Sequence, residues 1–190
     1  MTMSYSISII FIIFFTKICF AALGEETGLE IPRYISLKTD DANIRIGPSK
    51  NYPIILKFVQ KNYPLKVIDE YRDWRKVEDF KNNIGWIHKS LVSGNRTGII
   101  LRSDNLDVKV FNTVHGKEIG KVAHGNIIKI NKCKTNWCLI SIKEYKGWVN
   151  KKNIWGVDYN ELFKINLLQN FEDIYWKSVN YFNFLYQSKD

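Results

Sequence analysis

The chain has 190 residues, of which 45% are hydrophobic, 14% aromatic and 25% charged, a composition that supplies packed cores and does not indicate disorder. Its net charge of +9 and its interleaved basic and aromatic residues are also found in proteins that bind single-stranded nucleic acid. The basic residues form no dense block and the N-terminus predicts export. We therefore expect no nucleic-acid partner and a solvated basic surface that favours anionic envelope surfaces.

The first 24 residues differ from the rest of the chain and predict a signal peptide. An apolar run over 7–15 is followed by small residues, although no positive charge precedes the run. Three cleavage positions stay open, after Ala21, Ala22 or Gly24. The alternative is an uncleaved membrane anchor over 7–23, which has the minimum length of a spanning helix, but Lys17 inside it favours cleavage. We therefore expect a periplasmic or secreted protein.

The remaining chain contains one small β unit twice. Three landmarks recur in the same order, with 43–46 matched by 107–110, 73–77 by 136–140 and 85–87 by 147–149. The offsets of 64, 63 and 62 residues are nearly constant, and the small slips belong in loops. We therefore expect, in chain order, a linker at 25–34, a first domain at 35–94, a second domain at 95–157 and a tail at 158–190.

Each unit offers six short strand candidates separated by polar turns. Those of the first unit are 35–38, 43–46, 54–59, 65–70, 74–78 and 84–88. Those of the second unit are 99–101, 106–111, 118–122, 127–132, 137–142 and 147–150. Short strands at this density indicate a small antiparallel barrel, so the fold class is all-β with two tandem barrels.

Two cysteines lie outside the leader, Cys133 and Cys138, on either side of the polar turn 134–137. Opposed residues of a tight hairpin bring their Cα atoms to about 4.5 Å, which a disulfide tolerates. We expect these cysteines to be bonded, in keeping with export. A metal site is the alternative and would add His115 and His124, but histidines nine residues apart do not match structural zinc spacing. We expect no metal and no cofactor.

The segment 43–48, Asn-Ile-Arg-Ile-Gly-Pro, followed by Tyr52, resembles the Asn-Leu-Arg-x-Gly-Pro signature that opens bacterial SH3-like domains. Trp74 and the triplet 85–87, Gly-Trp-Ile, stand where that family carries its own Trp and Gly-Trp-Val. In the second unit the resemblance is weaker, because 111–112, Phe-Asn, stands in place of Gly-Pro. The segments 33–38, 86–91 and 154–157 are also similar to a two-repeat version of this domain found in exported alphaproteobacterial proteins. The resemblance implies two tandem SH3-like barrels and leaves the ligand open.

Strand alternation predicts an aromatic surface. If Val77 and Ile87 face the core, then Trp74 and Trp86 point outward. With neighbouring tyrosines and the matching positions of the second unit, the candidate ligand-binding residues are Tyr52, Tyr71, Trp74, Trp86, Trp137 and Trp148. Such a groove suits an extended peptide or a cell-wall stem peptide. Alternatively, the rings cover a barrel end or pack against the other unit.

Arg45 carries the only charge of the opening signature and is a further candidate. Its guanidinium either contacts a carboxylate or phosphate of a ligand or makes a local hydrogen bond that holds the Gly47–Pro48 loop. The sequence contains no nucleophile elbow, no His-Glu-x-x-His and no phosphate-binding glycine-rich loop. We therefore expect no enzymatic activity.

The tail predicts a C-terminal α-helix over about 160–186. Its apolar residues recur three or four positions apart, as Leu168, Phe171, Tyr175, Val179, Phe182 and Tyr186. This stripe either packs on the barrels or docks on a partner or a membrane surface.

The function predicted from these observations is that of an exported, non-enzymatic binding module. It would recognise cell-wall peptide or peptidoglycan through the aromatic grooves of its repeats. The alternative is a scaffold or regulatory partner of an envelope protein, without a small ligand.

Overall fold

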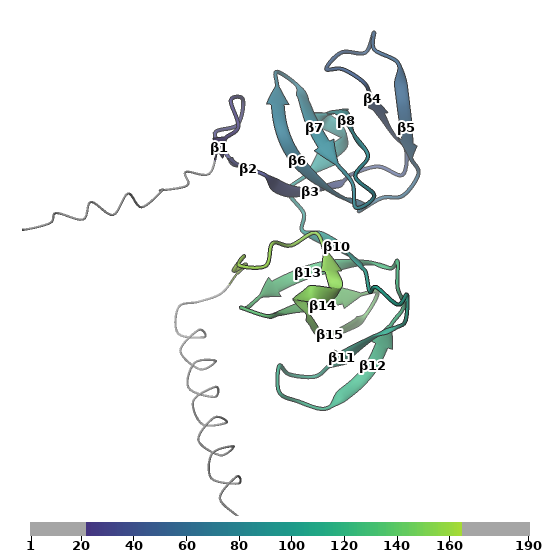
Figure 1. Cartoon of the computed structure of the whole chain (residues 1–190), viewed down its shortest axis with the longest axis vertical. Coiled ribbons are helices and arrows are strands. Elements are labelled where there is room, and N and C mark those ends of the chain that lie inside the picture. Colours follow the sequence, from purple (N-terminus) through teal and green to yellow (C-terminus); the bar gives the residue numbers. More distant parts are fainter. Residues whose placement is uncertain (1–21, 165–190) are drawn as a thin grey trace, which may run out of the picture.

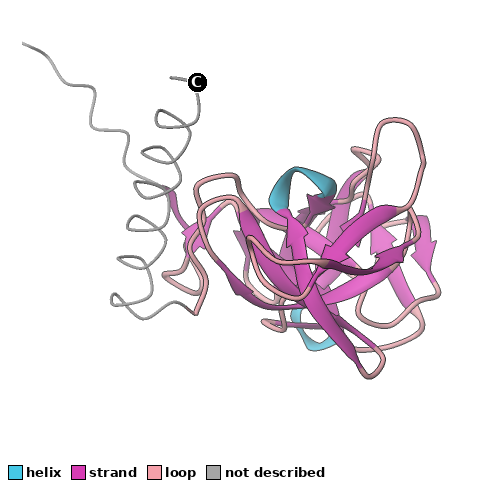
Figure 2. Cartoon of the chain, turned by 90° about the horizontal axis from the view of Figure 1, so that it is seen from below, coloured by secondary structure: helices cyan, strands magenta, loops and turns pink. Residues whose placement is uncertain are grey.

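The structure is a computed structural model that describes residues 22–164. It contains two seven-stranded antiparallel sheets, one per repeat, which lie one after the other along the molecule (Figure 1). Figure 2 shows the same part of the chain as strands and loops, with only two short helical turns. The all-β class is therefore confirmed, and each of the twelve predicted strands overlaps an observed one.

The first sheet has the strand order β5-β4-β8-β7-β6-β3-β9. Its strands are β3 (Arg33–Leu37), β4 (Ala42–Arg45), β5 (Ile54–Phe58), β6 (Pro64–Tyr71), β7 (Trp74–Glu78), β8 (Ile84–His88) and β9 (Val92–Ser93). The 3-10 helix η1 (Lys89–Leu91) connects β8 to β9. The sheet encloses a core whose fully buried members include Leu37, Leu65, Val67 and Ile87.

The second sheet repeats this order as β12-β11-β15-β14-β13-β10-β16. Its strands are β10 (Thr97–Ile100), β11 (Val108–Phe111), β12 (Glu118–Val122), β13 (Ile127–Cys133), β14 (Trp137–Ile142), β15 (Tyr145–Asn150) and β16 (Ile154–Trp155), with η2 (Lys151–Asn153) before β16. Its separate core includes Ile100, Ile128, Ile140 and Val149. The chain therefore folds around two hydrophobic centres.

Strand register shows which residues of the two repeats are equivalent. Ala42 pairs with Phe58 as Val108 pairs with Val122, and Arg45 pairs with Trp86 as Phe111 pairs with Trp148. The match of 43–46 with 107–110 is therefore wrong by two residues. The loop from β11 to β12 spans 112–117 and is two residues shorter than 46–53, so Phe111 takes the place of Arg45.

The glycine of each Gly-Trp landmark is required by close packing of neighbouring strands. A Cβ atom on Gly85 would lie 2.3 Å from Cγ2 of Ile44, and one on Gly147 would lie 2.2 Å from Cγ1 of Val110. Only glycine lets the strands approach this closely. The recurrence of this residue therefore reflects the same strand crossing in both barrels.

The two repeats secure the same hairpin position by different chemistry. Cys133 pairs with Cys138 at a Cα separation of 4.1 Å and the two are joined by a disulfide, which confirms that prediction. The equivalent pair of the first repeat is Glu70 and Arg75, whose Oε1 and Nε atoms lie 3.3 Å apart. A covalent bond in one barrel thus takes the position of a buried ion pair in the other.

Reducing the disulfide is expected to lower the free energy of unfolding of the second repeat by about 2 kcal/mol, because the loop that it closes is short. Urea unfolding with and without dithiothreitol measures the effect. A variant that carries Cys133→Ala and Cys138→Ala should not respond to the reductant. An unchanged unfolding midpoint of the wild-type chain in dithiothreitol would contradict the prediction.

A series of aromatic rings joins the repeats. Ring centroids lie 4.4 Å apart for Phe58 and Tyr63, 6.2 Å for Tyr63 and Phe80, 6.4 Å for Phe80 and Trp155, and 5.4 Å for Trp155 and Tyr34. The series begins in the first core and reaches β16 of the second sheet. It brings Phe80 of the first repeat against the second.

The segment predicted as leader end and linker forms a short hairpin, β1 (Ala22–Leu23) with β2 (Glu30–Ile31). Its turn wraps the Glu70 carboxylate, which accepts hydrogen bonds from the backbone N–H groups of Glu26 and Thr27. This part of the expected linker is thus folded. The rest of the predicted signal peptide lies outside the described residues.

The predicted tail helix also lies mostly outside the described residues. The stretch 160–164 is described and is not helical, which corrects the predicted helix start. Phe163 instead forms an antiparallel bridge with Cys133 and thereby extends the edge of β13. Among residues 22–164, no helix has the length and apolar character needed to span a bilayer.

Candidate functional site

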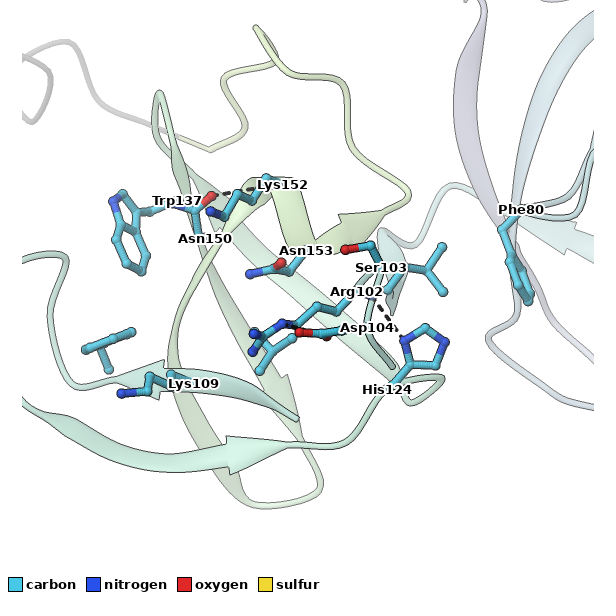
Figure 3. Close-up of a pocket in the computed structure, with 13 residues that line it drawn as sticks. Phe80, Arg102, Ser103, Asp104, Lys109, His124, Trp137, Asn150, Lys152 and Asn153 are labelled. Atoms are coloured by element: carbon cyan, nitrogen blue, oxygen red, sulfur yellow. Dashed lines mark hydrogen bonds and ion pairs between the residues drawn. The ribbon is translucent and has the colours of Figure 1, made fainter. Parts of the chain in front are cut away.

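A cleft of about 1030 Å³ opens on the second repeat, between the loop after β10, the start of β14 and η2. Trp137 stands at one end and His124 at the other, beside Phe80 of the first repeat (Figure 3). The side chains of Arg102 and Asp104 lie between these ends. Both repeats therefore contribute to the lining.

The apolar end of the cleft consists of two rings. Trp137 and Phe111 meet edge to face, with centroids 5.5 Å apart and an angle of 87° between their planes. Both side chains are half-buried. Cys138, which is fully buried and disulfide-bonded, follows Trp137 directly and holds the backbone from which the indole projects. The rings form a partly exposed wall suited to apolar ligand groups.

Basic side chains make the cleft positively charged. Arg102, Lys109 and Lys152 line it, and Asp104 is its one acidic residue. The Nε atom of Arg102 lies 2.8 Å from Oδ1 of Asp104, and Nη1 donates to the carbonyl oxygen of Asp107. These contacts hold the guanidinium in place. Lys109 Nζ lies 2.9 Å from Oε2 of Glu118, whereas Lys152 has no ion-pair partner among residues 22–164. The lining thus has an excess of basic over acidic side chains, which is the charge balance that favours an anionic group.

The orientation of His124 is set by the backbone. Its Nδ1 atom accepts a hydrogen bond of 3.1 Å from the N–H group of Arg102, so the neutral ring carries its proton on Nε2 (Figure 3). His124 can therefore donate a hydrogen bond from its Nε2–H group to a ligand in the cleft. Within 22–164, no group of three or more His, Cys, Asp or Glu side chains is arranged to hold a metal ion.

In the first repeat the equivalent indole, that of Trp74, is covered rather than open, which was one of the two alternatives for these rings. Trp74 is only 9% exposed, and its ring meets that of His88 edge to face at 5.4 Å. His88 pairs with Trp74 in register, as Asn150 pairs with Trp137. Both partners also cap the following 3-10 helix. The larger imidazole covers its indole, whereas Trp137 opposite the smaller Asn150 stays half exposed.

The other candidates of the first repeat do not line this cleft. Arg45 donates from Nη1 to the carbonyl oxygen of Tyr52 at 2.6 Å, which is the local hydrogen bond that was one of its two alternatives. The Tyr52 ring lies against Gly47. Trp86 is half-buried and pairs with Arg45 and Lys76. Arg45 and Tyr52 thus hold the β4–β5 loop, and Trp86 lies in the sheet beside it.

Two predicted ring positions lie beside basic side chains. Tyr71 is 46% exposed, with the Arg72 guanidinium 5.4 Å from its ring centroid. Trp148 is half-buried, and Lys134 Nζ lies 5.5 Å from its ring centroid. Neither residue lines the cleft. The structure therefore places only Trp137, among the predicted site residues, in it.

Sequence reasoning missed Phe111, Arg102 and His124. Phe111 was matched with the Gly-Pro position of the signature, and correct matching needs the strand register. Arg102 lies in the connection from β10 to β11, and no landmark of the repeat falls in the equivalent connection of the first repeat. His124 lies in the turn between β12 and β13, and its sequence distance from Arg102 does not reveal that the two residues are neighbours in the fold.

No curated protein matches the chain. Among solved structures, NlpC2 from Trichomonas vaginalis is 13% identical, with a TM-score of 0.30 over 67% of this chain and 50% of its own. An NlpC/P60 family protein from Bacillus cereus is 10% identical, with a TM-score of 0.28 over 64% and 55%. The chain spans about half the length of these proteins.

The family profile described as bacterial SH3 domain matches residues 38–94 and 118–156, which make up half of the chain. The two matched segments fall in the two sheets whose strand order and register repeat. The chain therefore belongs to the bacterial SH3 domain family.

Proposed function

We propose that the chain is an exported, non-enzymatic binding module that takes a carboxylate-bearing cell-wall peptide in the Trp137 cleft. The observation that carries this proposal is the partly exposed Trp137–Phe111 wall beside three basic side chains. Bacterial SH3 domains often bind peptidoglycan, which supports the ligand class. Export of the chain, with its predicted signal peptide, is part of the proposal.

Stem peptides fit the chemistry of the cleft. They are short and extended, and they carry free carboxylates next to small apolar side chains. Lys152, which has no ion-pair partner among residues 22–164, would attract a carboxylate, and the Trp137 face would cover the apolar groups. The side chains of Ser103 and Asn153 add hydrogen-bonding groups for the peptide backbone. Because the charges are solvent-exposed, binding should weaken as salt is raised.

Phe80→Ala is expected to weaken binding about fivefold to tenfold, because it removes the wall that the first repeat contributes and one ring of the interrepeat series. Titration calorimetry with a soluble stem peptide measures the effect. Tyr71→Ala is the matched control, since Tyr71 is exposed and lies outside the cleft. Equal losses in both variants would contradict a role for Phe80.

The proposal is tested by cosedimentation with purified peptidoglycan sacculi. Retention is expected on intact sacculi and should disappear after an amidase removes the stem peptides. Retention on stripped sacculi would assign binding to the glycan strands and overturn the peptide proposal. Absence of retention on both would overturn wall binding and favour the alternative, an envelope protein as partner.

A further inference from the structure

A second hollow, separate from the Trp137 cleft, penetrates the barrel of the second repeat. It has a volume of about 300 Å³ and lies between the β11–β12 hairpin and the β14–β15 hairpin. Its apolar lining is Val110, Val122, Ile140 and Ile142, with Ile119 and Tyr145 at the opening. This volume is at the lower end of ligand pockets, so the hollow suits one aliphatic segment or ring.

The first repeat shows why the hollow exists. By strand register Gly120 is the equivalent of Leu56, and Val122 is the equivalent of Phe58. Phe58 is 8% exposed and stacks on Tyr63 with ring centroids 4.4 Å apart. The second repeat therefore has smaller residues than the first at two positions on one strand, Gly120 and Val122. The space is therefore a difference between two copies of one fold, and not a property of the fold itself.

The opening of the hollow is apolar with a positive border. Ile119 is 55% and Tyr145 78% exposed, an unusual exposure for such side chains. Lys121 and Lys146 also line the hollow, and neither ammonium group has an ion-pair partner in the part of the chain that the structure describes. The lining contains no carboxylate. An occupant with an apolar body and a negative end would match this arrangement.

We propose that this hollow binds the aliphatic chain of a single-chain carboxylate amphiphile, with the carboxylate facing Lys121 and Lys146. A peptide suits the hollow less well, because the side chains that line it provide almost no hydrogen-bond partners for peptide amides. The site is independent of the peptide cleft. It would give one module two ligands of different chemistry.

Titration of the full chain with dodecanoate, below the concentration at which it forms micelles, tests the proposal. Binding is expected, and affinity should fall about fourfold for each methylene removed from the chain. Val122→Phe and Gly120→Leu each install the residue of the first repeat and should reduce affinity at least tenfold. Gly120→Leu is the safer variant for folding, because a Cβ atom at Gly120 meets nothing within 4 Å.

The charge requirement has its own comparison. The double variant Lys121→Gln, Lys146→Gln should lose affinity for dodecanoate and keep its affinity for dodecanol. All three variants should bind the stem peptide as the wild-type chain does, which would show that the hollow and the peptide cleft are separate sites. Dodecanoate affinity that survives both Val122→Phe and Gly120→Leu would overturn the proposal. Binding to phosphatidylglycerol vesicles or an acidic peptide, without binding to dodecanoate, would overturn it as well.

Discussion

Glu70→Gln is expected to lower the free energy of unfolding of the first repeat by about 3 to 5 kcal/mol, the cost of breaking a buried ion pair. Glu70 is 3% exposed. Its Oε1 atom contacts Arg33 Nη2 at 2.5 Å and Arg75 Nε at 3.3 Å. Its Oε2 atom accepts hydrogen bonds from the N–H groups of Glu26 and Thr27. Glutamine would leave two guanidinium charges at a buried barrel end without a counter-charge.

The same carboxylate predicts a dependence on pH. Burial alone would raise the pKa of Glu70, but hydrogen bonds from Arg33 and Thr27, with the charges of Arg33 and Arg75, outweigh it and lower the pKa. Because the folded-state pKa is lower than the unfolded-state value of about 4.3, this contribution is present above that value. It is lost as the pH falls through the folded-state pKa. The Cys133–Cys138 bond at the equivalent position does not titrate in this way.

Urea unfolding followed by tryptophan fluorescence, at pH 7 and again below pH 4, measures both effects. The wild-type chain should lose stability on acidification, and the Glu70→Gln variant should lose less. Asp69→Asn is the matched control, since Asp69 is exposed and asparagine keeps the oxygen that accepts the hydrogen bond from the Glu70 N–H group, so stability should change by about 0.5 kcal/mol or less. A Glu70→Gln chain as stable as wild type at pH 7 would show that the ion pair contributes nothing.

Trp137→Ala is expected to weaken stem-peptide binding by about 30-fold or more, the loss typical of a central aromatic residue in a binding site. The indole is the largest ring that lines the cleft, and its removal also leaves Phe111 without its edge-to-face partner. The second repeat should stay folded, because its core lies on the other side of β14 around Cys138 and Ile140.

Titration calorimetry with a soluble stem peptide gives the affinity ratio. Trp86→Ala is the matched control, since Trp86 is a half-buried tryptophan of the first repeat outside the cleft, and its affinity should stay within about threefold of wild type. The opposite pattern, a large loss for Trp86→Ala and none for Trp137→Ala, would move the site to the first repeat. Circular dichroism confirms that both variants are folded.

Local patterns in the sequence predict the parts of this fold that local geometry determines. Alternation and turn residues place the strands, and a short hairpin with two cysteines predicts the Cys133–Cys138 bond. Alternation also predicts on which face of β7 the Trp74 side chain lies. It says nothing about what covers that face, and the covering His88 comes from a neighbouring strand.

The candidate sites depend on register between strands, which the sequence leaves uncertain. Phe111 meets Trp137 because strand register puts Phe111, rather than Lys109, in the place of Arg45. The apolar hollow follows from small residues at Gly120 and Val122, and their effect is visible only once Leu56 and Phe58 are known as their equivalents. Side-chain volumes across strands therefore decide where each barrel is open.

The most direct test uses the indole N–H resonances of the tryptophans in a nitrogen-15-labelled chain, recorded while a soluble stem peptide is added. The Trp137 resonance is expected to shift until the peptide saturates the site, while that of the covered Trp74 should stay in place. Shifts at Trp74 or Trp86 with an unchanged Trp137 resonance would contradict the assignment of recognition to the second repeat.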